Sequence, residues 1–336
     1  MGTHQMKFDS VGVIGGGAWG TALAQTMALA GRDVCLWAYE PDTIREINEH
    51  RMNRVFLPGV TIEPKIKATG KLADAAAADV ILLVPPAQHL RRIASALFEH
   101  LPEGSAVVVC AKGIEQATGK LMSDVVSEAL PQALLAVLSG PSFAADVARG
   151  LPAAVTLACQ DEAAGRALAE GLGYRNLRIY WSSDTVGVEL GGAVKNVLAI
   201  AAGIVDGKEL GASAHAALVT RGFAELRRFG EALGARPETM MGLAGLGDLI
   251  LTCSSPQSRN MSLGRALGQG RSIDDVLGER RAVTEGVFTA EAVNRIAAEK
   301  GIELPICAAV HAIVKDQISV NDAIEGLLSR PQRSEG

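Results

Sequence analysis

Two lysines and one aspartate lie beside glycine-rich segments that are far apart in the chain. CAKGIE carries Lys112, GGAVKN carries Lys195 and GLAGLGDL carries Asp248. A lysine amine exchanges a proton efficiently near neutral pH only when its pKa falls from ~10.4 toward ~7–8. Burial and a neighbouring Lys112 cation would lower the pKa of Lys195, whereas a nearby Asp248 carboxylate would raise it. These residue types fit acid–base chemistry, although Lys195 as an exposed helix lysine and Asp248 as a helix cap are ordinary alternatives.

Three further polar segments could contribute to the same chemistry. SGPSFA, residues 139–144, offers backbone N–H groups and the Ser142 hydroxyl. Ser258-Arg-Asn260 forms a polar triplet whose arginine could equally be a surface charge, and VTEG covers residues 283–286. The two glycines before Lys195 lie in a helix-compatible segment, where each costs about 1 kcal/mol relative to alanine. We therefore expect a ligand or another backbone to approach them closely.

A glycine motif near the N-terminus predicts a nucleotide site. Gly15, Gly17 and Gly20 follow an apolar run, residues 11–14, and precede a helix-compatible segment. The first glycine permits the tight turn, the second lets the backbone approach a pyrophosphate, and the third lets the helix pack on the strand. The helix start would then offer N–H groups to the phosphates. Glu40, twenty residues beyond Gly20, could accept a hydrogen bond from a ribose hydroxyl, which favours a dinucleotide over an empty glycine turn.

The first half of the chain alternates apolar runs with helix-compatible segments. The runs predict strands over residues 11–14, 34–37, 80–84, 106–110, 134–138 and 153–158. Helices are expected over residues 21–30, 88–98, 120–129 and 162–171, with Gly31 as the glycine that follows the first of them. This alternation is typical of a parallel sheet covered on both faces by helices. We therefore predict an α/β, Rossmann-like N-terminal domain, in which Lys112 lies at the carboxyl end of a strand.

The second half predicts helices only. Long alanine-rich segments are helix-compatible over residues 184–205, 213–233, 261–267, 272–277, 289–300, 305–315 and 320–328. Because no proline- or serine-rich linker separates the halves, we expect the two domains to pack firmly. The predicted division is residues 1–190 for dinucleotide binding and residues 191–336 for an all-α, substrate-binding domain.

Composition excludes several classes of protein. The 336 residues are 48% hydrophobic and 21% charged, which is ordinary for a packed chain and excludes intrinsic disorder. A net charge of −5 argues against a nucleic-acid partner. The five scattered cysteines form no CxxC pair, and the six histidines show no ligand spacing, so we expect a reducing compartment and no metal site. The N-terminus lacks an apolar signal core, and we expect no apolar run of ~20 residues, hence no membrane insertion and a cytoplasmic protein.

Taken together, the motifs resemble the bacterial NAD(P)-dependent glycerol-3-phosphate dehydrogenase family. They are, in the family's order, GGGAWG, CAKGIE, SGPSFA, LGGAVKNVLAIAAGI, MGLAGLGDLILTC, QSRN and VTEG. The resemblance implies reversible hydride transfer between sn-glycerol 3-phosphate and dihydroxyacetone phosphate, with NAD or NADP as cofactor. It also implies a homodimer whose product supplies the glycerol backbone of membrane phospholipids.

The resemblance also implies roles for individual residues. Lys195 matches the general base, Lys112 a lysine that contacts cofactor and substrate, and Asp248 a carboxylate of the substrate site. The substrate-binding set that it implies is Lys112, Gly140, Ser142, Lys195, Asp248, Ser258, Arg259 and Asn260. The planar fork of Arg259 suits a phosphate dianion. Together with the glycine motif, the cofactor-binding set is Gly15, Gly17, Ala18, Trp19, Gly20, Tyr39, Glu40, Lys112, Ala144, Arg259, Val283 and Glu285.

Two departures leave the cofactor preference open. Ala18 stands where many family members have serine, and Tyr39-Glu40 occupies a variable pair. Glu40 would repel the 2′-phosphate of NADP, but Arg45 lies nearby and Tyr39 could stack on an adenine. A 3-hydroxyacid or 6-phosphogluconate dehydrogenase is disfavoured by the GLGDLILTC and SRN segments, and a non-catalytic dinucleotide sensor by the lysine pair and Asp248.

Overall fold

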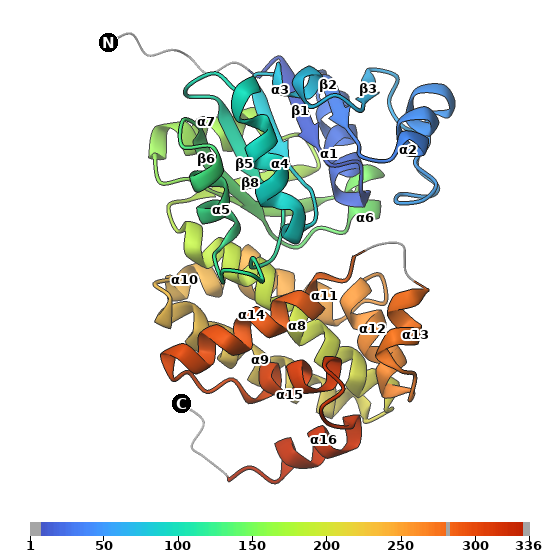
Figure 1. Cartoon of the computed structure of the whole chain (residues 1–336), viewed down its shortest axis with the longest axis vertical. Coiled ribbons are helices and arrows are strands. Elements are labelled where there is room, and N and C mark those ends of the chain that lie inside the picture. The colour runs from blue at the N-terminus through green and yellow to red at the C-terminus, as the bar shows by residue number, and fades with distance from the viewer. Residues whose placement is uncertain (1–7, 280–282, 332–336) are drawn as a thin grey trace.

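The computed structural model describes residues 8–279 and 283–331 of the chain. These residues form an α/β domain and a helical domain, which lie one above the other in Figure 1. All described strands belong to the first domain, and the described chain beyond residue 184 contains helices and turns. The predicted Rossmann-like domain followed by an all-α region is therefore confirmed.

One eight-stranded sheet organises the α/β domain, in the order β3-β2-β1-β4-β5-β6-β7-β8. Its strands are β1 (Ser10–Ile14), β2 (Asp33–Trp37), β3 (Ile66–Thr69), β4 (Val80–Leu83), β5 (Ala106–Val109), β6 (Leu134–Ser139), β7 (Ala153–Ala158) and β8 (Leu177–Ser182). β1 pairs in parallel with both β2 and β4, so the direction of winding reverses beside it. Doubly wound sheets bind ligands at the carboxyl ends of the strands at such a reversal.

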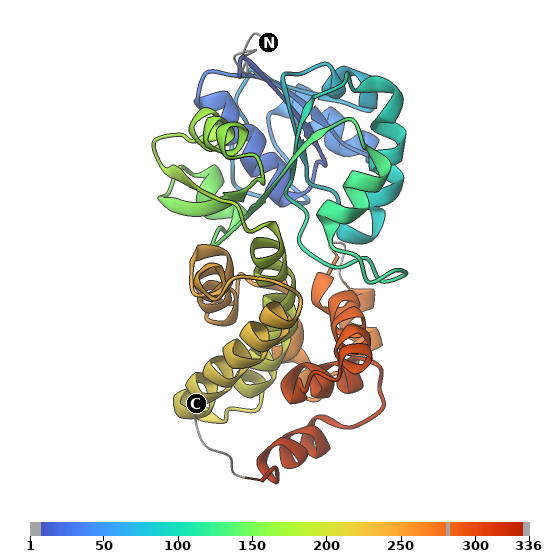
Figure 2. The same ribbon diagram turned by 90° about the vertical axis from the view of Figure 1, so that its left-hand side faces the viewer.

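Helices cover both faces of this sheet (Figure 2). They are α1 (Ala18–Leu29), α2 (Pro41–Arg45), α3 (Leu72–Ala76), α4 (Leu90–Leu97), α5 (Met122–Ala129), α6 (Ala144–Ala148) and α7 (Glu162–Leu172). Alternate residues of the strands enter two separate cores, since Val11 and Val13 pack with side chains of α1 and α7, and Ile81 and Leu83 with those of α4 and α5. Burial on both faces explains why the central strands are continuous apolar runs.

The sheet departs from the prediction in two respects. β7 runs antiparallel to β6, so the sheet is not wholly parallel. The connection between these strands contains only the five-residue helix α6, which packs on α1, and a short connection suits an antiparallel neighbour. The prediction also lacked β3 and β8, whose residues are in part exposed and therefore less apolar than the central strands.

Nine named helices form the described part of the second domain. They are α8 (Thr185–Gly207), α9 (Gly211–Ala232), α10 (Pro237–Met240), α11 (Asp248–Cys253), α12 (Arg259–Gly268), α13 (Ile273–Gly278), α14 (Glu285–Lys300), α15 (Pro305–Val314) and α16 (Val320–Leu328). α8 lies at the centre and contacts α9, α11, α12, α14 and α15. A Cβ atom on Gly264 would lie 1.9 Å from the carbonyl oxygen of Ile200, so glycine is what lets α12 approach α8 this closely.

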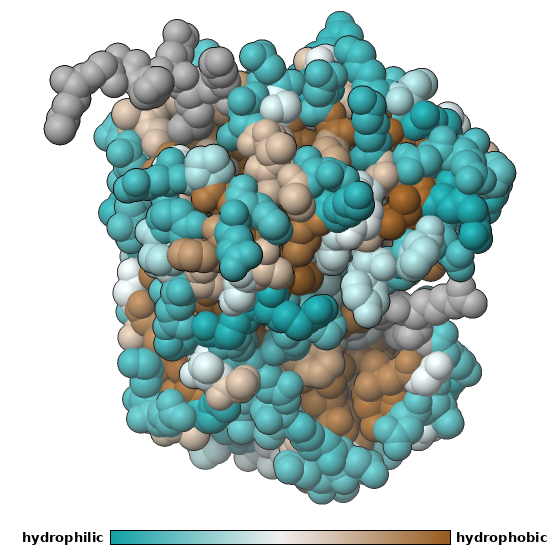
Figure 3. Space-filling model, turned by 45° about the horizontal axis from the view of Figure 1, so that its top comes forward, coloured by the Kyte–Doolittle hydropathy of each residue, from teal (hydrophilic) through white to brown (hydrophobic). Residues whose placement is uncertain are grey.

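Helix α8 corrects one expectation. It spans 23 residues and is apolar enough to cross a membrane by length and hydropathy, although no such run was expected. All of its apolar window is buried inside the protein, as in the core helix of a helical domain. On the face shown in Figure 3 the surface is mainly hydrophilic, and hydrophobic residues show chiefly in its recesses.

Candidate active site between the two domains

The three residues proposed for proton chemistry lie in direct contact. Lys195 Nζ lies 2.6 Å from Asp248 Oδ1, and Lys112 Nζ lies 2.6 Å from Asp248 Oδ2. Lys112 follows the carboxyl end of β5, Lys195 lies in the middle of α8, and Asp248 begins α11. Asp248 is 1% exposed, so it is a buried carboxylate between two ammonium groups and not a solvated helix cap. The Lys112–Asp248 ion pair joins the α/β domain to the helical domain.

Burial decides the protonation of Lys195. It is the largest influence and lowers the pKa of this lysine; the Asp248 carboxylate raises the pKa and the Lys112 cation lowers it, with a result of about 8. Removal of an ammonium group from water disfavours its charged form, and a single carboxylate shared with a second cation does not compensate. The amine of Lys195 can therefore gain or lose a proton near neutral pH.

Thr252 belongs to this cluster and was not predicted. Lys195 Nζ donates a hydrogen bond to Thr252 Oγ1 at 2.8 Å, in addition to its ion pair with Asp248. Thr252 lies four residues after Asp248 on α11, and residues at this spacing lie on the same face of a helix. That spacing is the signal in the sequence that could have identified it.

The glycines before Lys195 permit close approach, as expected. A Cβ atom on Gly191 would lie 2.3 Å from the carbonyl oxygen of Ala244, in the turn that leads to Asp248. A Cβ atom on Gly192 would lie 2.4 Å from Ser139 Oγ and 3.4 Å from Lys112 Cδ. Both glycines therefore bring a neighbouring segment against α8.

The SGPSFA segment lies against the same cluster. Lys112 Nζ donates to the carbonyl oxygen of Gly140 at 3.0 Å, and Ser142 Oγ donates to the same oxygen at 3.1 Å. Gly140 has φ +149°, in the range that favours glycine, and a Cβ atom there would lie 2.8 Å from Val155 Cα. Ser139 Oγ is buried and has no hydrogen-bond partner among residues 8–279 and 283–331. The sequence did not identify Ser139 as a residue of the site. Ala144 begins α6, directly after this segment.

The glycine motif forms the expected turn at the carboxyl end of β1. Gly15 has φ +134°, and a Cβ atom on Gly20 would lie 1.9 Å from the carbonyl oxygen of Gly15, so α1 could not pack here with a larger residue. Thr21 N donates to Gly17 O, which leaves the N–H groups of the first turn, including Ala18 and Trp19, without intrahelical acceptors. A Cβ atom on Gly17 would meet nothing within 4 Å. This open cradle of N–H groups fits a dinucleotide pyrophosphate.

Tyr39 and Glu40 follow the end of the neighbouring strand β2. Tyr39 is 70% exposed, and Glu40 is also exposed, at the start of α2. Arg45 pairs with Asp42 at 2.7 Å, with both side chains largely exposed. An acidic residue at this place fits a ribose hydroxyl, while the exposed Arg45–Asp42 pair leaves the cofactor preference open.

The predicted phosphate-binding triplet has mixed roles. Arg259 is the first residue of α12, and burial lowers its pKa, which the Glu285 carboxylate opposes. Ser258 Oγ accepts from Met261 N at 3.2 Å and caps this helix. Asn260 Nδ2 donates to Asn196 Oδ1 at 2.9 Å. Ser258 and Asn260 therefore have partners within the protein, and they fix the start of the helix that carries Arg259.

Glu285 joins the two domains near the nucleotide turn. Glu285 Oε1 accepts a hydrogen bond from Ala87 N at 3.1 Å, and Ala87 follows β4 of the α/β domain. Burial raises the pKa of Glu285, and the Ala87 hydrogen bond and the Arg259 cation oppose this. Its Oε2 atom is buried and has no hydrogen-bond partner within the described parts of the chain, so it could accept from a ligand. Val283 lies two residues before it, at the edge of the described segment.

No metal centre accompanies this site in the described ranges. Within residues 8–279 and 283–331, no group of three or more His, Cys, Asp or Glu side chains is arranged to hold a metal ion. The arrangement that is present can transfer a proton at Lys195 and bind anionic groups at the glycine turn and beside Arg259.

Comparisons with known proteins agree with this arrangement. The N-terminal model of NAD-dependent glycerol-3-phosphate dehydrogenase matches residues 10–165, and the C-terminal model matches residues 184–325. The glycerol-3-phosphate dehydrogenase [NAD(P)+] of Caulobacter vibrioides is 59% identical over 330 residues, which cover 98% of this chain and 100% of that protein. That of Parvibaculum lavamentivorans is 58% identical, with 98% and 99% covered.

Solved structures show the same likeness. The glycerol-3-phosphate dehydrogenase of Coxiella burnetii superimposes with a TM-score of 0.91 at 37% identity, covering 96% of this chain and 99% of that one. The Saccharomyces cerevisiae enzyme gives a TM-score of 0.80 at 27% identity, with 95% and 98% covered.

Proposed function

Because the chain belongs to the NAD-dependent glycerol-3-phosphate dehydrogenase family, we propose that it interconverts sn-glycerol 3-phosphate and dihydroxyacetone phosphate. It is an oxidoreductase with an NAD(P)-binding, Rossmann-like domain. The observation that carries the proposal is the buried cluster in which Asp248 binds both Lys195 and Lys112; burial there lowers the pKa of Lys195 to about 8.

Lys195 acts as the general base in alcohol oxidation. The nicotinamide, when bound, accepts the hydride from the alcohol carbon and returns it in the reverse direction. Neutral Lys195 takes the hydroxyl proton during oxidation, and protonated Lys195 supplies it to the oxygen during reduction. Asp248 and Thr252 hold the amine in place through the contacts at 2.6 and 2.8 Å.

Lys112 and Arg259 bind the substrate from opposite domains. Lys112 lies beside the Gly140–Ser142 segment, which supplies further polar groups. The Lys112 cation stabilises negative charge that develops on the substrate oxygen. Arg259 binds the phosphate dianion, because a guanidinium can donate two parallel hydrogen bonds to it. Ser258 and Asn260 support that role by fixing the start of α12.

The carboxyl edge of the sheet would hold the dinucleotide. The Gly15–Gly20 turn, which includes Ala18 and Trp19, would bind its pyrophosphate through backbone N–H groups, and the exposed Tyr39 and Glu40 would bind its adenosine. Ala144, Val283 and Glu285, together with Lys112 and Arg259, complete the cofactor set. Glu40 supports NAD, and the preference between NAD and NADP is a quantity to be measured.

The remaining assignments follow from the family and belong to the same proposal. Residues 1–190 bind the dinucleotide, residues 191–336 bind the substrate, and the chain functions as a cytoplasmic homodimer. Its product supplies phospholipid synthesis. The protein needs neither a nucleic-acid partner nor insertion into a membrane.

The test follows nicotinamide absorbance with dihydroxyacetone phosphate and either NADH or NADPH. We expect oxidation of the cofactor that depends on dihydroxyacetone phosphate, and the ratio of the two kcat/KM values measures the cofactor preference. Binding of both cofactors without turnover would contradict the proposal and favour a sensor or another substrate.

A further inference from the structure

Lys112 lies on a loop whose backbone is closed on itself. The lysine loop, residues 111–121, leads from β5 to α5. Within it, Glu115 N donates to Lys120 O at 2.9 Å, Gly119 N donates to Glu115 O at 2.8 Å, and Ile114 and Leu121 form an antiparallel bridge. The Lys112 side chain bonds to Gly140 and Asp248, both outside its own loop. Its position therefore depends on what holds the loop from outside.

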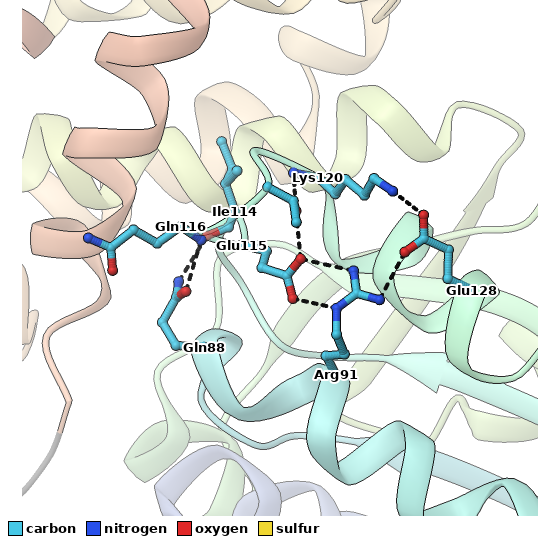
Figure 4. Close-up of polar contacts among 8 residues, drawn as sticks. Gln88, Arg91, Ile114, Glu115, Gln116, Lys120 and Glu128 are labelled. Carbon is cyan, nitrogen blue, oxygen red and sulfur yellow. Dashed lines mark hydrogen bonds and ion pairs between the residues drawn. The ribbon is translucent and has the colours of Figure 1, made fainter.

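Gln88 holds the lysine loop next to Lys112. Its amide Nε2 donates to the carbonyl oxygen of Ile114 at 2.9 Å, and its Oε1 accepts from Gln116 N at 2.9 Å. Figure 4 shows this amide facing the loop backbone on both sides of Glu115. The side chain thus pairs with the loop as a neighbouring strand would, two to four residues beyond Lys112. Gln88 itself lies in the short turn Ala87–His89 that follows β4.

A second set of contacts holds side chains of the same loop, from Glu115 onward. Arg91 of α4 binds both oxygens of Glu115, at 2.8 and 2.9 Å, and also binds Glu128 of α5 at 2.9 Å. Thr118 donates to Glu115, and Lys120 pairs with Glu128 (Figure 4). The Arg91 hydrogen bonds hold the pKa of Glu115 below its ordinary value, so this carboxylate is charged at neutral pH. These side-chain contacts therefore anchor the loop at Glu115 and beyond it, and they do not involve Gln88.

The helical domain holds the opposite side. Gln116 Nε2 donates to Glu291 Oε2 of α14 at 2.7 Å, and Glu291 also pairs with Lys315. The residue before Gln88, Ala87, donates its N–H to Glu285 at the start of the same helix. Gln88 therefore lies where the turn after β4, the lysine loop and α14 meet.

We infer that Gln88 is a positioning residue, which holds the lysine loop so that Lys112 stays in register with Asp248. The inference rests on the proposed function, because it gives Gln88 a role only through Lys112. A catalytic group has to be held within ~0.5 Å of its productive place, and rotamers locked by supporting hydrogen bonds provide this. A displacement of about 1 Å can cost as much as ~10²-fold in rate. Arg91 does not replace Gln88, because it reaches the loop through the Glu115 side chain, whereas Gln88 bonds directly to the backbone of Ile114 and Gln116.

The test compares Gln88→Met, which keeps the side-chain length but loses both hydrogen bonds, with the wild-type enzyme. We expect kcat/KM for dihydroxyacetone phosphate to fall by about 10- to 100-fold, chiefly through kcat. The thermal unfolding midpoint should fall only by what two lost hydrogen bonds cost, and the Kd for NADH should stay at the wild-type value. Gln88→Ala provides a second variant. Gln132→Met is the matched control, because Gln132 is also half-buried and donates to one carbonyl, that of Phe98, away from the lysine loop.

A double-mutant cycle with Lys112→Ala shows whether Gln88 acts through Lys112. Once Lys112→Ala has removed the ammonium group, Gln88→Met should reduce the remaining rate by less than about twofold, because coupled residues are not additive. An equal loss in both backgrounds would overturn the inference, as would wild-type kinetics for both Gln88 variants. If Lys112→Ala alone had wild-type activity, the proposed role of Lys112 would fail, and the inference with it.

Discussion

The carboxylate of Asp248 lies 2.6 Å from the Lys195 amine, at a place where almost no water reaches either group. The same carboxylate binds Lys112 with its other oxygen. If the Asp248 carboxylate had the largest effect on the pKa of Lys195, this lysine would stay protonated and could not act as a base. Burial dominates instead, and it lowers the pKa of Lys195 to about 8.

Replacement of the base should abolish most turnover and spare cofactor binding. Lys195→Met keeps the apolar stem and removes the amine, so we expect kcat to fall by about 10²- to 10⁴-fold, the usual contribution of general acid–base catalysis. The Kd for NADH, measured by fluorescence, should be unchanged. Turnover near that of the wild type would remove Lys195 from the mechanism.

The rate should depend on pH with opposite signs in the two directions. Oxidation needs neutral Lys195, so its kcat/KM should rise as pH increases through about 8, and reduction should decline over the same range. Asp248→Asn removes the influence that raises the pKa of Lys195, so the midpoint of the profile should move to lower pH and kcat should also decrease. A midpoint that moved to higher pH would show that Asp248 does not act on Lys195 in this way.

Loss of the Arg259 guanidinium should weaken recognition of the substrate phosphate more than recognition of the alcohol. Arg259→Ala should raise KM for dihydroxyacetone phosphate by about 10-fold or more, because a charged hydrogen bond contributes roughly 1.5–3 kcal/mol. The control substrate is unphosphorylated dihydroxyacetone, whose kcat/KM should be almost unaffected. An equal loss with both substrates would contradict a phosphate role.

Two glycines in helices should respond oppositely to alanine. At Gly192 the new methyl group would lie 2.4 Å from Ser139 Oγ and would press on Lys112, so Gly192→Ala should lower both kcat and the unfolding midpoint. At Gly326, in α16, nothing lies within 4 Å, and Gly326→Ala should stabilise the protein by about 0.4–1 kcal/mol. Thermal unfolding of both variants tests the pair, and equal midpoints would show that Gly192 is not tightly packed.

A buried carboxyl group outside the active site should make stability depend on pH. Glu189 of α8 accepts hydrogen bonds from the N–H and hydroxyl of Ser123 in α5, and burial raises its pKa from 4.5 to about 7 despite them. The folded state thus keeps a proton that the unfolded chain releases. The free energy of unfolding should therefore fall as pH rises from about 4.5 through about 7, by at most about 3 kcal/mol.

Glu189→Gln should remove this dependence, because an amide does not titrate in that range. The measurement is urea denaturation of both proteins at pH 5 and pH 8, with Glu99→Gln, at an exposed glutamate, as the control. If Glu189→Gln kept the wild-type difference between the two pH values, another group would be responsible.

The parts of the fold with strong local patterns were predictable from the sequence. The central strands and helices such as α8, α14 and α16 lie within a few residues of their predicted places, because burial on one or all sides leaves a long apolar signature. The strands β3 and β8 were missed because they are half-exposed strands at the edges of the sheet, whose apolar pattern is weak. The short helix α11 was missed because tertiary packing against α8 fixes the turn before it, where a Cβ atom on Gly191 would lie 2.3 Å from the carbonyl oxygen of Ala244.

Less of the site followed from the residues alone. Spacing identified the nucleotide turn, but the contact of Lys112 with Asp248 joins residues from two domains, which no local pattern reveals. The pKa of Lys195 depends on how much burial outweighs one carboxylate, which only the packed structure specifies. Thr252 and Ser139 were missed because such hydroxyl residues are common in helices and at strand ends.

Helix α8 passes residue 190 without a break, five residues before Lys195. Lys112 belongs to the sheet domain and Lys195 to the helical domain, while Asp248 binds both, so neither half carries a complete set of proton-transfer groups. An exchange of halves between relatives at this boundary would join two different sequences within one helix and would have to preserve the Lys112–Asp248 contact across it. We therefore expect that the dinucleotide-binding half and the helical half were inherited together, without exchange of either half for a domain of another protein.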